Sequence, residues 1–118
     1  MNDGGGRTRN WAWFAGRPWP GMWALDILQA ARFCRDRFPG STVMVEATGR
    51  FGWPTLLAGA VVPGLIRAGT VAVPVSSMHE SARAQGDASL ADVPGLLERL
   101  DVPQIRRLWP EVDVRVKP

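Results

Sequence analysis

The chain of 118 residues contains one cysteine, one histidine, one lysine and no tyrosine. Because Cys34 stands alone, no intramolecular disulfide can form, and a zinc site built on paired thiolates is excluded. The first residues carry charge but no run of seven apolar residues, so a secretory signal is not predicted. The longest weakly polar run, residues 53–66, contains two prolines and is shorter than the roughly 20 residues that a membrane-spanning helix needs. We therefore expect a cytoplasmic chain with no membrane segment, no structural metal and no cofactor.

Charge is present in both signs and is spread along the whole sequence. Thirteen arginines, one lysine and eleven carboxylates give a formal net charge of +3. No stretch contains five or six like charges in succession, as a nucleic-acid-binding tail would. Solvated helix faces explain this pattern best, since net charge bears on solubility before it bears on function. Binding to nucleic acid is the less favoured interpretation.

Six tryptophans are many for a chain of this length, because each large ring needs a sizeable surface to cover it. Residues 11–20 are rich in Trp, Gly and Pro, and we expect a loop with exposed rings there. The rings that we expect to form an exposed patch include Trp11, Trp13, Trp19 and Trp23. Exposed apolar patches mark interfaces, so this segment predicts self-association or a protein partner.

The spacing of apolar residues predicts the order of the elements. Three glycines near the start indicate a flexible leader over residues 1–15, ahead of a single domain over residues 16–118. A helix is expected over residues 21–38, with Cys34 on its buried apolar stripe. A strand at residues 42–47 is expected to be buried on both faces. A helix at residues 53–62, with Pro54 in its first turn, and a strand at residues 70–75, preceded by a turn at Gly69, complete a parallel βαβ unit.

The second half of the chain is expected to hold shorter elements. Residues 76–92 are polar and predict a long surface loop, followed by short helices at residues 93–100 and 102–109. Asp101 is the expected N-cap of the second of these helices. Residues 112–116 alternate valine with charged residues, which is typical of a half-exposed edge strand. The predicted fold is α/β, with about three mostly parallel strands and flanking helices.

Residues 43–56 have the pattern of a buried strand that turns at small residues directly into a helix. A nucleophile elbow has this shape: the reactive side chain occupies a sharp strand-to-helix turn, and small residues on either side allow the bend. In the best register the elbow comprises Ala47, Thr48, Gly49, Arg50 and Gly52. Gly49 occupies the nucleophile position, and we expect a positive φ there.

Together these elements resemble part of an α/β-hydrolase, and more narrowly the acetyl xylan esterase-like and dienelactone hydrolase-like branch. Three stretches carry the resemblance: Gly16-Arg17-Pro18 through Asp26-Ile27-Leu28, Val45 to Gly52, and Val93-Pro94-Gly95-Leu96-Leu97 with Leu100-Asp101-Val102-Pro103. The resemblance spans roughly residues 16–117. It implies a partial three-layer sandwich of esterase ancestry.

The departures from that family concern the catalytic groups. Active members carry a nucleophile where this chain has Gly49, and Phe51 is large for the small position that follows. The family's acid and histidine come after later strands, and no counterpart of that histidine is found. Moving the register to Thr48 would place Glu46 and Arg50 at the small positions, which defeats the bend. We therefore expect a vestigial elbow without an intact Ser-His-acid triad, in a domain that is not catalytic by itself.

Two further groups of residues are candidates for a site. His79 lies among Ser76, Ser77, Glu80 and Ser81, and a set so crowded in sequence does not adopt the geometry of a triad, which gathers its groups from separate elements. The backbone amides of residues 48–52, assisted by Arg50, are a candidate anion site at a helix N-terminus. The alternative function is a small interaction module that uses its Trp-rich face and open sheet edges.

Overall fold

The computed structural model describes residues 16, 19–73, 77 and 100–117. The elements run in the order α2 (Trp19–Arg37), β1 (Met44–Ala47), the 3-10 helix η1 (Gly49–Phe51), α3 (Gly52–Val61), β2 (Ala68–Val73), α5 (Val102–Leu108) and β3 (Val112–Val116). The three strands form one sheet in the order β1-β2-β3, and both pairings are parallel. The predicted small α/β fold with a parallel sheet is confirmed, as is the edge position of residues 112–116.

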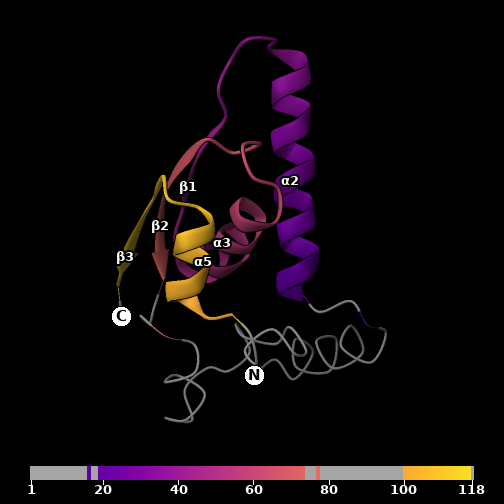
Figure 1. Ribbon diagram of the computed structural model, residues 1–118. Helices are drawn as coiled ribbons and strands as arrows, with labels where there is room; N and C mark the ends of the chain where they lie inside the picture. The colour runs from indigo at the N-terminus through magenta and orange to yellow at the C-terminus, as the bar shows by residue number, and fades with distance from the viewer. Residues whose placement is uncertain (1–15, 17–18, 74–76, 78–99, 118) are drawn as a thin grey trace.

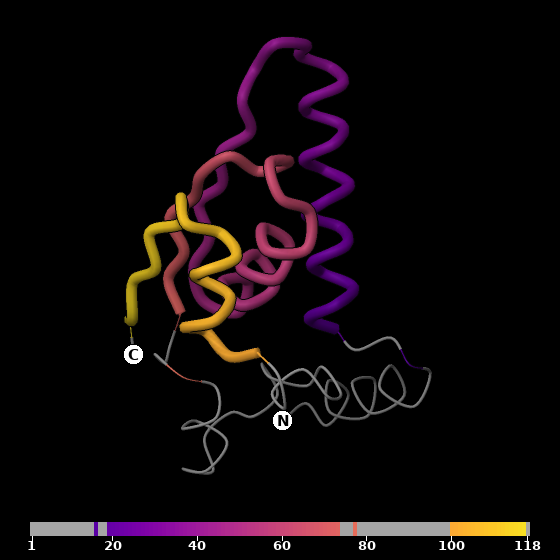
Figure 2. The backbone as a smooth tube through the Cα atoms, viewed as in Figure 1, coloured from indigo at the N-terminus to yellow at the C-terminus, as the bar shows by residue number. Residues whose placement is uncertain are grey.

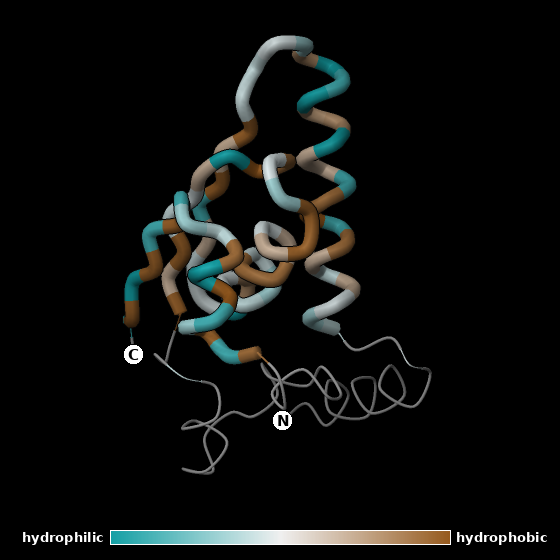
Figure 3. The backbone as a smooth tube through the Cα atoms, viewed as in Figure 1, coloured by the Kyte–Doolittle hydropathy of each residue, from teal (hydrophilic) through white to brown (hydrophobic). Residues whose placement is uncertain are grey.

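The helices cover one face of this sheet (Figure 1). α3 contacts β2 directly, α5 packs beside α3, and α2 packs on α3. α3 contains no charged residue, and its residues 52–59 are all buried. A helix that is apolar all round belongs inside a protein, and α3 occupies that place because α2 and the sheet enclose it from two sides. Figure 3 shows the contrast: apolar residues run along α3 and β2, while α2 alternates between apolar and polar residues.

Alternate residues of the strands face the helices. Val45 of β1 is in register with Gly69 of β2, which is in register with Val112 of β3. Because side chains of a strand alternate between faces, Met44 and Glu46 point to the other face of the sheet. Both are exposed, and only Ala47 of β1 is buried. The prediction that this strand is buried on both faces was wrong, because apolar Met44 lies on the face that no described helix covers.

α2 begins two residues earlier than predicted, so residues 19 and 20 belong to this helix and not to a loop. Pro20 lies in the first turn, where the missing N–H of proline costs nothing. The rings of Trp19 and Trp23 are one turn apart, with centroids 5.7 Å from each other. Such a pair at spacing four supports the first turn of the helix.

The buried stripe of α2 consists of Pro20, Ala24, Leu28 and Ala31. Beyond Ala31 the helix extends past α3 (Figure 2). Every residue from 32 to 42 is exposed. Cys34 lies in this exposed part. Its prediction as a core residue was wrong, because the stripe ends where the neighbouring helix ends.

The turn between α3 and β2 comprises residues 62–66, where Gly64 has φ 82°. Gly69, which was expected in this turn, lies inside β2. A Cβ at Gly69 would be 2.8 Å from Cη2 of Trp109 and 2.8 Å from Cγ1 of Val45. This glycine is therefore required by the packing of a tryptophan ring against the sheet and not by a turn.

Several predictions fall wholly or mainly outside the described residues. These are the leader over residues 1–15, the strand residues 74 and 75, the loop at 76–92 apart from Ser77, the helix at 93–100 apart from Leu100, and the rings of Trp11 and Trp13.

Candidate functional site: the elbow after β1

The elbow connects the last residue of β1 to the first turn of α3 in four residues. Thr48 is extended, with φ −136° and ψ 161°, and Gly49 has φ 61°. The amide of Phe51 donates to the carbonyl of Thr48 at 3.3 Å, and Gly52 has the right-handed helical values φ −58° and ψ −53°. The positive φ predicted for Gly49 is confirmed. The chain therefore makes a sharp strand-to-helix turn at the carboxyl end of a parallel strand, which is where open α/β sheets bind their ligands.

Two small residues allow this turn to lie close to the sheet. Ala47 is buried and is in register with Val71 of β2. A Cβ at Gly52 would overlap the carbonyl oxygen of Ala72 in β2. The close approach therefore falls at Gly52 and not at Phe51, which explains how a large side chain is tolerated in the elbow.

Phe51 instead points outward and connects the elbow to α2. Half of its surface is exposed, and its ring centroid lies 5.6 Å from that of Trp23. Together with the Trp19–Trp23 contact, this forms a small aromatic cluster beside the elbow: Trp19, Trp23 and Phe51. The sequence pointed to the tryptophans, but the place of Phe51 in this cluster depends on the packing of α2 against α3 and has no signal in the local sequence.

The tip of the elbow exposes a threonine, a glycine and an arginine. Thr48, Gly49 and Arg50 are exposed, and the side chain of Thr48 makes no capping hydrogen bond to the helix that follows. An ideal Cβ at Gly49 has no atom within 4 Å, so the space that a nucleophile would occupy is open. The described residues thus provide the backbone of an elbow without a nucleophilic side chain at its tip. His79, the sole histidine of the sequence, lies outside them.

A polar contact that the sequence did not reveal lies beyond β2. Ser77 Oγ donates to Oδ2 of Asp101 at 2.6 Å, across 24 positions of sequence. The other oxygen, Oδ1, accepts from the amide of Val102 at 2.7 Å, and Gln104 Oε1 accepts from the Asp101 amide at 3.0 Å. Asp101 is therefore the predicted N-cap, within a full capping box, and also fastens the segment after β2 to α5. The D-x-x-Q spacing indicates the cap, whereas no local pattern identifies a partner so far away in sequence.

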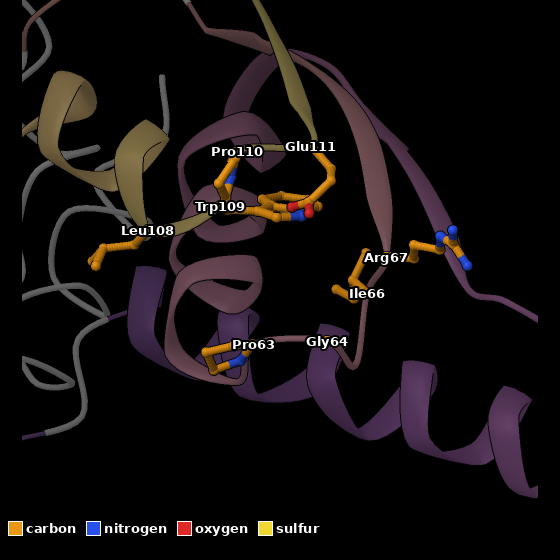
Figure 4. Close-up of a pocket in the computed structure, with 8 residues that line it drawn as sticks. All are labelled: Pro63, Gly64, Ile66, Arg67, Leu108, Trp109, Pro110 and Glu111. Carbon is orange, nitrogen blue, oxygen red and sulfur yellow. The ribbon is translucent and has the colours of Figure 1, made fainter.

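A hollow of about 220 Å³ lies near the opposite ends of the strands from the elbow. Figure 4 shows the residues that line it: Pro63, Gly64, Ile66, Arg67, Leu108, Trp109, Pro110 and Glu111. The side chain of Arg67 points away from it in this view. Nε1 of Trp109 is buried and has no hydrogen-bond partner within the described part of the chain. Glu111 is the one residue of this lining whose side chain could act as a base, and none of the lining residues is a Ser, Thr, Cys or His.

Comparison with known proteins gives no significant match to any family model, curated protein or solved structure. Over the described ranges, no group of three or more His, Cys, Asp or Glu side chains is placed to hold a metal ion. Within the same ranges, no helix combines the length and apolarity that crossing a membrane requires. The fold defines a small α/β protein with a parallel sheet and an elbow at the end of its first described strand.

Proposed function

We propose that this chain is an α/β-hydrolase-like domain of esterase ancestry that does not hydrolyse esters by itself. The proposal includes the finer architecture that the resemblance implies, a partial three-layer sandwich. The described residues supply the parallel sheet and the helices of one face, in the order strand, elbow, helix, strand, helix, strand.

The conformation of Gly49 is the observation that carries this proposal. Its φ of 61° is the strained value that a nucleophile elbow imposes at its tip, and it occurs between β1 and α3, where such an elbow belongs. Glycine adopts this backbone without the penalty that a side chain incurs. The backbone of a hydrolase elbow has thus been retained at a position where no side chain can attack an acyl carbon.

The experiment is to restore a hydroxyl at this position. We expect Gly49→Ser to hydrolyse p-nitrophenyl acetate no faster than the unmodified chain or the buffer, because the described residues place no base and acid beside the elbow to activate the serine. The matched control is Gly40→Ser, since Gly40 also has a positive φ, 83°, and open space above it, but lies far from the elbow in sequence. Saturable turnover by Gly49→Ser alone would mean that a base completes the site, and the proposal of an inactive domain would be wrong.

A second candidate function is a protein-interaction module, and the exposed elbow aromatic supports it. Phe51 contacts the ring of Trp23 in a tilted arrangement with half of its own surface exposed, and β1 forms an edge of the sheet with no described strand beside it. Exposed strand edges pair with other strands. Sedimentation of the unmodified chain and of Phe51→Ser tests this. An oligomer of the unmodified chain that is lost in Phe51→Ser supports the module, and monomeric behaviour of both chains counts against it.

A further inference from the structure

α2 has a second apolar stripe on the face opposite its buried one. Met22, Leu25 and Phe33 have 43%, 50% and 68% of their surface exposed, and Gln29 lies between the last two. The spacing of these four residues is three, four and four, so they share one side of the helix. With 3.6 residues per turn, Met22 is about 200° around the helix from Ala24, which faces α3. Figure 1 shows this helix at the outside of the described fold, with α3 on one side of it only.

The charges of α2 are distributed unequally between its two halves. Asp26 is the only charged residue from Trp19 to Ala31, whereas the last six residues contain three arginines and Asp36. The first part therefore carries a net charge of −1 and the end a net charge of +2. An antiparallel second α2 would set the negative half of each helix against the positive half of the other, whereas a parallel one would set like against like.

Three of the four stripe residues are arranged symmetrically about Gln29. Leu25 lies four residues before Gln29 and Phe33 four residues after it. In an antiparallel pair with its two-fold axis at Gln29, Leu25 of each copy faces Phe33 of the other. The two Gln29 amides face each other, and each can donate and accept a hydrogen bond. Such self-complementarity is what an interface between identical copies requires.

From these observations we propose that the stripe Met22, Leu25, Gln29 and Phe33 of α2 is a docking surface for a second copy of this chain, with the two α2 helices antiparallel. This surface is distinct from the elbow and from the exposed edge of β1. It depends neither on the hydrolase relationship nor on the aromatic cluster at Phe51.

The test measures self-association by sedimentation equilibrium in the background Cys34→Ser, which removes the exposed thiol as a source of covalent dimers. We expect a dimer whose association is about thirtyfold weaker in Leu25→Gln/Phe33→Gln, because two apolar side chains of each copy are then no longer buried when the copies pair. Ala30→Gln is the matched control, since Ala30 is exposed on the same helix but off the stripe, and its dimer should be unchanged. Circular dichroism verifies that each variant retains its helix content.

Cross-linking determines the orientation. Met22→Cys and Asp36→Cys chains, each also carrying Cys34→Ser, are mixed and oxidised. An antiparallel pair centred on Gln29 places position 22 of one copy beside position 36 of the other, so mixed dimers should predominate. The proposal is overturned if the chain remains monomeric at every concentration, if the double variant dimerises as well as the parent, or if each cysteine links only to itself.

Discussion

Individual glycines of this chain are required for two different physical reasons. Gly49 has a positive φ with open space above its Cα, so only its backbone conformation restricts the residue type. Gly52 and Gly69 have ordinary φ values, but neighbouring atoms occupy the position of a Cβ. The first kind tolerates any side chain that can adopt the left-handed region, and the second kind tolerates no side chain at all without movement of its neighbours.

The positive φ of Gly49 predicts how substitutions there change stability. We expect Gly49→Ala to lower the free energy of unfolding by an amount on the order of 1 kcal/mol, because alanine disfavours the left-handed region. Gly49→Asn should cost less, since asparagine visits this region more readily. Denaturant unfolding of the three chains measures both differences. Equal stability of the alanine and glycine chains would contradict the conformation assigned to the elbow.

At the scale of elements, the sequence predicts the order and type of each segment well where the signal is local. Pro54 in the first turn of α3, the N-cap at Asp101 and the alternating valines of β3 depend on residues a few positions apart, and the structure confirms them. The candidate site residues were likewise predictable where the signal lay within a few neighbouring residues. The turn at Gly49 could be predicted, because a strand, small residues and a helix succeed one another there.

Burial was harder to predict because it depends on which element lies opposite. Cys34 is exposed because it lies in the part of α2 that extends past α3. Met44 is exposed because no described helix covers its side of the sheet. The Phe51–Trp23 contact and the Ser77–Asp101 bond both join residues more than 20 positions apart. None of these can be inferred from a window of neighbouring residues.

The N-cap of α5 is expected to contribute to the stability of the fold. Asp101→Ala removes the acceptor of the Val102 amide and the partner of Ser77, so we expect a loss of about 1 kcal/mol in the free energy of unfolding. The control is Asp113→Ala, which breaks the exposed 2.8 Å ion pair with Arg115. Exposed pairs contribute little, so its effect should stay within about 0.5 kcal/mol. If the two variants lose equal stability in thermal unfolding, the cap is not the structural anchor described above.

For the whole molecule, the most unusual feature is the face of the sheet that no described helix covers. Parallel sheets are normally covered on both faces. Here the face opposite the helices presents polar side chains in neighbouring strands, including Glu46, Thr70, Asp113 and Arg115. Such a surface suits water, and any segment packed on it would have to bury the Asp113–Arg115 ion pair.

The distribution of burial predicts how the molecule opens. Val71 and Val73 of the central strand are almost fully buried, whereas residues 32–42 have no buried side chain. We expect the amides of β2 to exchange with deuterium most slowly, and those of the last six residues of α2 much faster, since local opening there exposes little apolar surface. Hydrogen exchange followed by mass spectrometry at high dilution measures this. Equal protection of both segments would mean that the end of α2 opens only with the core.

The packing of Trp109 restricts which substitutions can be accepted at two other positions during evolution. Its ring lies where the side chains of Gly59 and Gly69 would otherwise be, so one position in α3 and one in β2 are tied to a third just after α5. A larger residue at 59 or 69 can be accepted only after the indole has been replaced by something smaller, and the indole can arise only where both glycines already exist. Among descendants of a common ancestor, these three positions should therefore change together, although 50 residues separate the first from the last.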